Sequence, residues 1–476
     1  RELTPMNFLR LKLRILLLIL VVGNSWMVGR VHAVTVTVSP VAISNLYNGA
    51  ITLVITNGLT NGETVLIEKF GDFNTNGAVD AGELLVQSFL TTDGQATVVG
   101  GVTNLSVPGD LTSIDGAIVS RINFSGIDPQ QIVGNFVFRV SSPTGRFTPA
   151  TATFAVTNSN FGQSISGIVR HNGTNVPNAS VFFMAGPNQD FAGDVLADSS
   201  GNFTFKAPPG DYAVGAAKAG YVYDFSTAPH VTLTAGGNIS TNVPLIVGTR
   251  TISGSLRKMG TTNGLAGVLM PWESQNGAFI LSFTDANGNF NVPVTADQWK
   301  IKMQESAIAS LGFLPPRDSL HVDTTSGNIS NLNIEMPKAD ALFYGQLKNN
   351  SNVPLVGIEV FAENQNSYTY AGTSITDTNG NYFIGVVGTN WNVGPSSEDL
   401  SPLGYSANET NLNISSGQAI QLNFIAQLLT IHLGGRVVNG SGNPVGNIQM
   451  IVGAQNGPDF SGNTDNDGYF NIGLTA

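Results

Sequence analysis

A stretch of twelve residues near the N-terminus carries oxygen-bearing side chains at the spacing that a calcium ion requires. It reads Asp72-Phe-Asn-Thr-Asn-Gly-Ala-Val-Asp-Ala-Gly-Glu83, with oxygen ligands at loop positions 1, 3, 5, 9 and 12 and a glycine at position 6. Calcium prefers six to eight hard oxygen ligands, of which a glutamate at position 12 supplies two. We therefore expect Ca²⁺ as a cofactor, with these ligands: Asp72, Asn74, Asn76, the backbone carbonyl of Ala78, Asp80 and Glu83.

The segments on either side of this loop favour strands. Residues 63–70 and 84–89 are apolar and β-prone, and no pair of flanking helices is evident. We expect an EF-hand-type loop inserted between two strands, in which calcium stiffens the loop without the helix opening of a calcium sensor. An ordinary Asn- and Gly-rich hairpin is the alternative, and it would hold no metal.

A second pattern recurs four times along the chain. An aspartate stands three residues before a glycine and five residues before Phe or Tyr, and it begins at Asp198, Asp285, Asp377 and Asp465. The steps between these aspartates are 87, 92 and 88 residues, a period that indicates an array of whole small domains. We expect the aspartates to accept local backbone hydrogen bonds in tight turns, with the glycine at positive φ, in preference to binding metal.

The fold class that these patterns predict is all-β, as a tandem array of β-sandwich domains. Residues 34–160 alternate polar and apolar side chains between turn signals, and each later repeat opens with a strand that carries a glycine. We expect each domain to bury its own core, with short linkers that hold the domains in a row. The expected segments are a signal peptide in 1–33, a sandwich with the calcium loop in 34–160, and repeats in 164–247, 251–337, 341–427 and 430–476, the last one truncated.

The repeats resemble the carboxypeptidase regulatory-like domains, a transthyretin-like sandwich group allied to the Cna B-type repeats of bacterial surface proteins. The likeness rests on the opening S-G-x-[VL] strand, a second strand of the form Pro-x-x-x-[VI], the D-x-x-G-x-[FY] turn, Pro208-Pro-Gly210-Asp-Tyr212 and a Gly-Tyr pair, over residues 164–476. It implies spacing, stabilising or ligand-binding roles without catalysis. The Lys–Asn crosslinks of some Cna B-type repeats are not expected, because the matching strands carry Arg170, Arg257 and Arg436, and a lysine, Lys348, lies near the corresponding place in one repeat only.

The ends and the composition of the chain predict an exported protein. A basic segment, the apolar run 15–22 and Val31-His-Ala33 have the layout of a cleaved signal peptide, with a retained N-terminal membrane anchor as the alternative. No later segment is apolar enough to span a membrane. The formal net charge is −11 and there is no cysteine, which argues against nucleic-acid binding and excludes disulfides and thiol chemistry. We expect a secreted or cell-surface location, and a longer protein beyond Ala476.

Aromatic and titratable residues offer few other candidate sites. Tyr212, Trp299 and Trp391 occupy equivalent strand positions, which predicts core packing, whereas Trp272 lies outside the repeat pattern and leaves a sugar-binding role open. The histidines are scattered, and no hydrolase, nucleotide-binding or metalloprotease motif is present, so we expect no enzymatic activity.

The resulting hypothesis is a non-catalytic secreted or cell-surface protein, an adhesin-like or stalk-like array with a calcium-stabilised N-terminal domain. The expected partners are a carbohydrate or an extracellular protein, with no nucleic acid and no membrane span after signal cleavage. Two alternatives stay open: the non-catalytic N-terminal part of a large secreted hydrolase, and a set of carbohydrate-binding modules.

Overall fold

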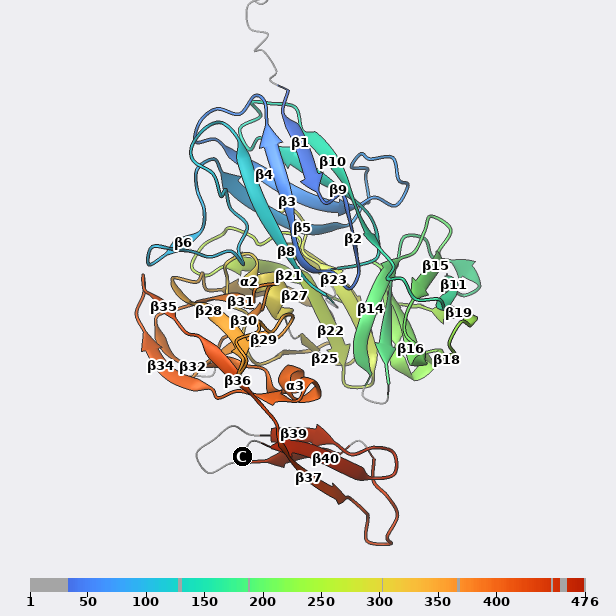
Figure 1. The fold of residues 1–476 in the computed structure, drawn as a ribbon. Helices are drawn as coiled ribbons and strands as arrows, with labels where there is room; N and C mark the ends of the chain where they lie inside the picture. The colour runs from blue at the N-terminus through green and yellow to red at the C-terminus, as the bar shows by residue number, and fades with distance from the viewer. Residues whose placement is uncertain are drawn as a thin grey trace, which may run out of the picture.

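The computed structural model describes residues 33–126, 131–186, 189–301, 303–365, 369–446, 448–453 and 460–474. The expected signal peptide therefore lies outside the described residues, apart from Ala33. The predicted fold class is confirmed: the described chain is all-β and forms several separate sheets (Figure 1). No helix in these ranges is long and apolar enough to cross a membrane.

The first sandwich packs two sheets around an aliphatic and aromatic core. Its strands are β1 (Thr35–Ser39), β2 (Ala42–Ser44), β3 (Asn48–Thr56), β4 (Thr64–Gly71), β5 (Leu85–Thr92), β6 (Val98–Val99), β7 (Val102–Thr103), β8 (Ile118–Ser125), β9 (Gly134–Ser141) and β10 (Ala150–Thr157). One sheet has the order β1-β3-β8 and the other β2-β10-β9-β4-β5. In β1, Val36 and Val38 are buried while Thr35, Thr37 and Ser39 are exposed, as the period of a half-buried strand requires.

Repeat 1 and repeat 2 follow, each with a parallel pair between its first and last long strands. The elements of repeat 1 are β11 (Ser164–His171), β12 (Thr174–Asn175), β13 (Ser180–Ala185), β14 (Asp190–Leu196), β15 (Asn202–Lys206), β16 (Gly210–Ala217), β17 (Tyr221–Asp224), η1 (Phe225–Thr227), β18 (His230–Leu233), β19 (Asn238–Pro244) and β20 (Ile246–Val247). Those of repeat 2 are β21 (Arg250–Lys258), β22 (Leu269–Ser274), β23 (Ala278–Phe283), β24 (Asn289–Val294), β25 (Gln298–Ile301), α2 (Glu305–Ala309), β26 (Leu320–Asp323) and β27 (Ile329–Met336). The parallel pairs are β11 with β19 and β21 with β27.

Repeat 3 has the same plan, and repeat 4 is represented by four strands. The elements of repeat 3 are β28 (Ala341–Asn349), β29 (Glu359–Asn364), β30 (Ala371–Ile375), β31 (Asn381–Val386), β32 (Thr389–Pro395), α3 (Ser397–Leu400), η2 (Ser401–Leu403), β33 (Tyr405–Ser406), β34 (Thr410–Ile414), β35 (Ala419–Gln421) and β36 (Phe424–Leu428). Those of repeat 4 are β37 (Ile431–Arg436), β38 (Gln449–Val452), β39 (Phe460–Asn463) and β40 (Tyr469–Leu474). In repeat 3, β28 pairs in parallel with β35 and β36.

The glycine in the opening strand of each complete repeat has a steric cause. A Cβ atom on Gly167, Gly254 or Gly345 would lie 1.6, 1.9 or 1.6 Å from a backbone carbonyl oxygen near the end of its repeat. These oxygens belong to Thr241, Leu332 and Leu422. Only a residue without a Cβ allows the two backbones to approach so closely, so the recurrent glycine follows directly from this strand contact.

Repeats 1 and 2 share a sheet, which the expectation of separate cores does not predict. Strand β17 of repeat 1 pairs with β23 of repeat 2, and the resulting six-stranded sheet has the order β20-β17-β23-β22-β25-β26. Phe279 and Leu281 of β23 pack against the core of repeat 1. Each unit has a core cluster of its own, as expected, but the cores of repeats 1 and 2 meet across the boundary, where Val222 of repeat 1 belongs to the core of repeat 2.

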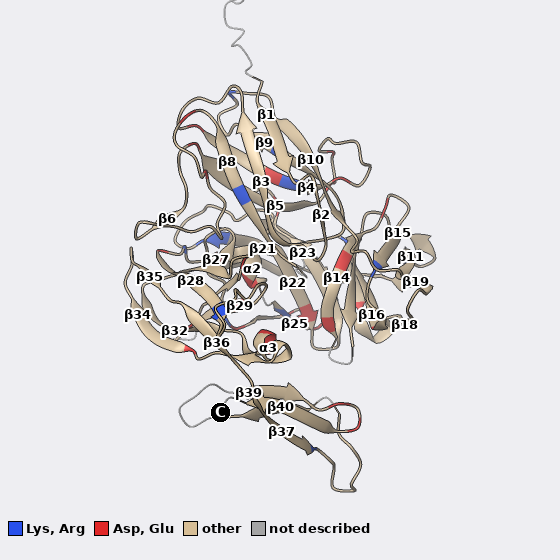
Figure 2. Cartoon of the chain, viewed as in Figure 1, with Lys and Arg blue, Asp and Glu red and all other residues tan. Residues whose placement is uncertain are grey.

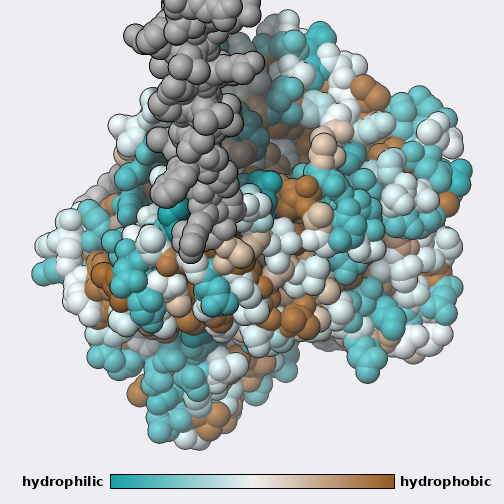
Figure 3. Space-filling model, turned by 90° about the horizontal axis from the view of Figure 1, so that it is seen from above, coloured by the Kyte–Doolittle hydropathy of each residue, from teal (hydrophilic) through white to brown (hydrophobic). Residues whose placement is uncertain are grey.

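The expected linear row is wrong for most of the chain. The first sandwich lies across repeats 1 to 3, while repeat 4 lies apart below them (Figure 1). Val133 of the first sandwich forms a β-bridge with Val195 of repeat 1, and Leu196 packs against the first sandwich's core. Charged residues are few and scattered over this assembly (Figure 2), and in the view from above apolar residues are interspersed with hydrophilic ones (Figure 3).

Candidate metal centre

The twelve-residue loop connects β4 to β5 at one end of the first sandwich. The two strands are antiparallel, and Phe70 pairs with Leu85 at the base of the loop. The backbone N–H of Gly71 donates to the carbonyl of Leu84 at 2.9 Å, and the N–H of Asp72 donates to that of Asn135 at 2.8 Å. Strands therefore flank the loop, as the apolar flanking segments predict, and their pairing fixes both of its ends.

Asp72 organises the first half of the loop. Its side chain is buried; Oδ1 accepts from the backbone N–H of Asn76 at 3.2 Å and Oδ2 from that of Gly77 at 3.0 Å. Gly77 has a φ of 72°, which provides the sharp turn expected at position 6. The hydroxyl of Thr151 on β10 donates to the carbonyl of Gly77 at 3.3 Å, so the tip of the loop is tied to the sheet beneath it.

The remaining polar side chains converge on Asp80. The amide nitrogens of Asn74 and Asn76 both donate to Asp80 Oδ2, each at 2.7 Å. Asn76 Oδ1 accepts from the N–H of Ala78 at 2.8 Å, and the N–H of Asp80 donates to Glu83 Oε2 at 2.9 Å. One hydrogen-bond network thus brings together all six residues that the sequence predicts as ligands. The two amides present nitrogen to the carboxylate, and a bound cation would require each of them to turn its oxygen inward.

Glu83 is the member of the network that has a side-chain oxygen without a hydrogen-bond donor. Its Oε1 atom is buried and has no hydrogen-bond partner among the described residues. Burial raises the pKa of Glu83, the nearby Asp72 and Asp80 charges act in the same direction, and the backbone N–H groups of Asp80 and Phe73 act to lower it. A buried carboxylate oxygen without a donor is a group that a hard cation would relieve.

The carboxylates alone do not make a complete metal site. Across the residues that the structure describes, no three His, Asp or Glu side chains lie close enough to one another to hold a metal ion. At this loop the amide oxygens of Asn74 and Asn76 and the carbonyl oxygen of Ala78 would have to complete the ligand set. Calcium accepts such oxygen ligands, whereas softer metals prefer nitrogen or sulfur. Calcium binding stays a prediction for this reason.

The repeated aspartates form turns with their hydrogen bonds satisfied locally. The Oδ1 atom of Asp285 accepts from the backbone N–H groups of Asn287 and Asn289, both at 2.8 Å, and the Gly288 N–H donates to the Asp285 carbonyl at 2.9 Å. Asp198, Asp377 and Asp465 accept the same two backbone bonds. Their role as turn residues, expected from the sequence, is therefore borne out by these contacts.

The aromatic residues considered for sugar binding are buried. Tyr212, Trp299 and Trp391 all lie in hydrophobic cores, as predicted. Trp272 is also fully buried, and its indole Nε1 donates to Ser282 Oγ at 3.1 Å. The ligand role left open for Trp272 is therefore wrong, because its strand β22 turns alternate side chains into the core of repeat 2.

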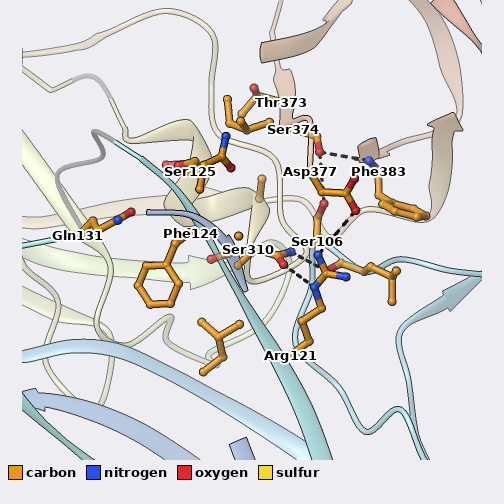
Figure 4. Close-up of a pocket in the computed structure, with 18 of the residues that line it drawn as sticks. Ser106, Arg121, Phe124, Ser125, Gln131, Ser310, Thr373, Ser374, Asp377 and Phe383 are labelled. Carbon is orange, nitrogen blue, oxygen red and sulfur yellow. Dashed lines mark hydrogen bonds and ion pairs between the residues drawn. The ribbon is translucent and has the colours of Figure 1, made fainter. Parts of the chain in front are cut away.

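Sequence analysis missed a pocket, the junction pocket, where the first sandwich, repeat 2 and repeat 3 meet. Arg121, Ser310 and Ser374 line it from three units that are separated by many residues in the chain (Figure 4). No local motif marks these positions, since Arg121 and Ser374 are ordinary strand residues of β8 and β30, and Ser310 is the C-cap of α2.

Comparison with known proteins gives matches among solved structures alone. No family model matches the chain, and no curated protein matches it in sequence. Among solved structures, the Bacillus anthracis TIE protein aligns at 12% identity over 83% of this chain and 75% of its own, with a TM-score of 0.18. The streptococcal ancillary pilin aligns at 11% identity over 58% and 92%, with a TM-score of 0.18. The pilus adhesin SpaC of Lactobacillus rhamnosus GG aligns at 12% identity over 78% and 57%, with a TM-score of 0.16.

Proposed function

We propose that this chain is a non-catalytic scaffold of a secreted or cell-surface protein, and that calcium stabilises its first sandwich through the loop 72–83. The observation that carries the calcium proposal is the convergence of Asn74, Asn76 and Asp80, together with the buried Glu83 Oε1 that lacks a partner. A hairpin built only for its turn would satisfy its own oxygens, as the repeated aspartate turns do.

The scaffold role is supported by how the units are joined. Sheet pairing between β17 and β23 and the β-bridge from Val133 to Val195 fix neighbouring units against one another in a chain that has no cysteine to crosslink them. The signal-peptide layout of residues 1–33 favours export. The carboxypeptidase regulatory-like type of the repeats belongs to the same proposal, supported by the glycine that each complete repeat places against its parallel strand.

The calcium proposal is tested by calorimetry on the full chain. Extracellular EF-hand-type modules bind with a Kd of about 10⁻⁴ to 10⁻³ M. Ten millimolar Ca²⁺ should then stabilise the native state by about 1 to 3 kcal/mol relative to EGTA, because calcium binds the folded loop and not the unfolded chain. Amide hydrogen exchange in residues 71–84 should slow at the same time, since the ion closes the loop.

Two variants separate metal binding from general stability. Glu83→Gln keeps the shape of the side chain but removes its charge, so it should abolish the calcium-dependent rise in melting temperature. Asp285→Asn makes the same charge change in a repeat turn and should leave the calcium response intact. An identical melting curve in calcium and in EGTA for the unsubstituted chain, with unchanged exchange at 71–84, would sink the proposal.

A further inference from the structure

The twelve-residue loop lies at the seam between the first sandwich and repeat 1. The backbone at the start of β9 is bonded to both sides of this seam. On the loop side, the N–H of Asp72 donates to the carbonyl of Asn135 at 2.8 Å. On the repeat side, the N–H of Val133 donates to the carbonyl of Asp194 at 2.9 Å, and the N–H of Leu196 donates to the carbonyl of Val133 at 2.8 Å. A short run of backbone therefore connects the first expected calcium ligand to β14 of the next unit.

Side chains close the same seam. Leu196 of β14 packs against the core of the first sandwich. A Cβ atom on Gly71, the residue before the loop, would lie 3.3 Å from Leu196 Cδ1 and 3.7 Å from Cζ of Phe73, so the absence of that atom leaves room for both side chains. A Cβ atom on Gly134, at the start of β9, would lie 2.8 Å from Leu196 Cδ1. The leucine of repeat 1 therefore fills a notch between the base of the loop and β9.

The side chain of Phe73 extends from the loop to repeat 1. Phe73 stands between two expected ligands, Asp72 and Asn74. The ammonium of Lys218, just after β16, lies 5.7 Å from the centroid of the Phe73 ring and donates to the carbonyl of Asn178 at 3.1 Å. Burial lowers the pKa of Lys218, and for such a desolvated ammonium the face of an aromatic ring takes the place of part of the water. The ring therefore links the ligand set to two segments of repeat 1.

Phe73 would be held from both sides by a bound ion. Asp72 and Asn74 would each provide an oxygen, and Asn74 would first have to turn, because its amide nitrogen now donates to Asp80 at 2.7 Å. A residue between two metal ligands loses torsional freedom when the ion binds, so its ring is held in one place. The stiffening reaches repeat 1 through contacts that already exist, which are the ring contact with Lys218 and the backbone bond of Asp72.

We propose that calcium at the loop 72–83 holds repeat 1 against the first sandwich through Phe73, so that the ion controls how readily this seam opens. This role rests on the proposed calcium binding and extends it to the neighbouring unit. A β-bridge and a few side-chain contacts form fewer hydrogen bonds than the long strand pairs inside each unit, so the seam is a place where local opening costs little. No cysteine is present to crosslink it.

Hydrogen exchange at single amides of the full chain tests the proposal. The amides of Val133 and Leu196 report on the seam, because each donates its hydrogen bond across it. The amide of Gly77 reports on the loop, because it donates to Asp72 Oδ2. For a Kd of about 10⁻⁴ to 10⁻³ M, about 10 mM Ca²⁺ slows any opening that requires release of the ion by about 10- to 100-fold. We expect the two seam amides to slow by at least about threefold in calcium relative to EGTA, while that of Val437, which is bonded within repeat 4, stays unchanged.

Two variants assign the effect to the ring. Phe73→Ala removes the ring and leaves the expected ligands in place, so Gly77 should still slow in calcium. The slowing at Val133 and Leu196 should fall to less than about half of its value, because the contact with repeat 1 is lost. Tyr469→Ala removes an exposed ring from repeat 4 and should change neither response.

The outcomes separate this proposal from the proposed function. If Gly77 in the unsubstituted chain exchanges equally in calcium and in EGTA, calcium does not bind the loop, and both proposals are wrong. If Gly77 slows while Val133 and Leu196 do not, calcium binds the loop and the seam proposal alone is overturned. Full slowing of the two seam amides in Phe73→Ala overturns it as well, since the seam would then respond without the ring.

Discussion

The loop at 72–83 and the repeated aspartate turns both begin with an aspartate that folds the backbone around its own carboxylate. In the turn at Asp285, the carboxylate accepts hydrogen bonds from the backbone N–H groups of Asn287 and Asn289, and the Asp285 carbonyl accepts one from Gly288. The turn therefore needs no further donor or ligand. In the loop, Asp72 makes the comparable backbone bonds, yet additional oxygen-bearing side chains gather beside it. One of them, Glu83, keeps a buried oxygen without a partner.

The contrast teaches that an aspartate near a glycine is uninformative by itself. What distinguishes a candidate ion site from a turn is the balance of donors and acceptors around it, because buried oxygens that exceed the local donors must be neutralised in some other way. The turns are balanced and the loop is not. Substitutions that affect the loop 72–83 and the aspartate turns differently therefore test whether the excess of oxygen acceptors in the loop marks an ion site.

We expect the largest difference in stability between substitutions of the two glycines, Gly288 in the turn and Gly77 in the loop. Gly288 has a φ of 76°, and a Cβ atom there would lie 2.6 Å from both Gly264 Cα and Leu265 N, which are backbone atoms that cannot move aside. Gly288→Ala should lower the free energy of unfolding by about 3 kcal/mol. Gly77→Ala meets only the Thr153 methyl at 3.2 Å, so it should cost about 1 kcal/mol in EGTA. Calorimetry of both variants measures the difference, and equal losses would contradict it.

The second-largest difference is expected in the calcium response of variants of the two aspartates, Asp285 in the turn and Asp72 in the loop. Asp285→Ala removes two backbone hydrogen bonds from an exposed turn, and we expect a loss of about 1 kcal/mol that is the same in calcium and in EGTA. Asp72→Ala should cost at least as much in EGTA and should also eliminate the additional stability that calcium provides. Melting temperatures of both variants with and without calcium decide this; a calcium response that survives in Asp72→Ala would remove the loop from consideration as the binding site.

Local features of the fold were predictable from the sequence because they are set by neighbouring residues. The alternation in β1 and the opening-strand glycines such as Gly167 indicated strands and a repeated plan, and the structure explains the latter by a carbonyl oxygen 1.6 Å from where a Cβ would stand. The alternation in β22 also contained the information that Trp272 faces inward with Met270. Trp272 was considered a ligand candidate because it lies outside the repeat pattern, and the alternation in β22 was not applied to it.

The relations between units were not predictable in the same way. Strand β17 joins β23 of the next repeat, and nothing in the residues 221–224 distinguishes this pairing from one within repeat 1. The junction pocket likewise depends on Arg121, Ser310 and Ser374, whose proximity arises only when the first sandwich lies across the repeats. Periodicity reports which face of a strand is buried, but it does not report which neighbouring unit covers that face.

The smallest expected effect is that the stability contributions of Glu83 in the loop and of Asp198 in a turn depend on pH with opposite signs. The pKa of Glu83 is raised by burial, so in EGTA the folded state holds this proton more tightly than the unfolded chain does, and the contribution of Glu83 to stability falls as pH rises through the raised pKa. At Asp198, burial acts to raise the pKa, but the hydrogen bonds from Asn202 and Ser200 outweigh it, and the net pKa is lowered. Its contribution is present above the unfolded pKa and is lost as pH falls through the lowered one.

Melting temperatures between about pH 3 and pH 7 measure both contributions against matched amides. In EGTA, Glu83→Gln should gain on the unsubstituted chain as pH rises, whereas Asp198→Asn should lose on it over the same range. Calcium should reverse the first trend, because the ion competes with the proton for Glu83 and its apparent affinity falls on acidification. If Glu83→Gln and Asp198→Asn shift in the same direction with pH in EGTA, the two carboxylates share one environment, and the distinction drawn between the loop and the turns does not hold.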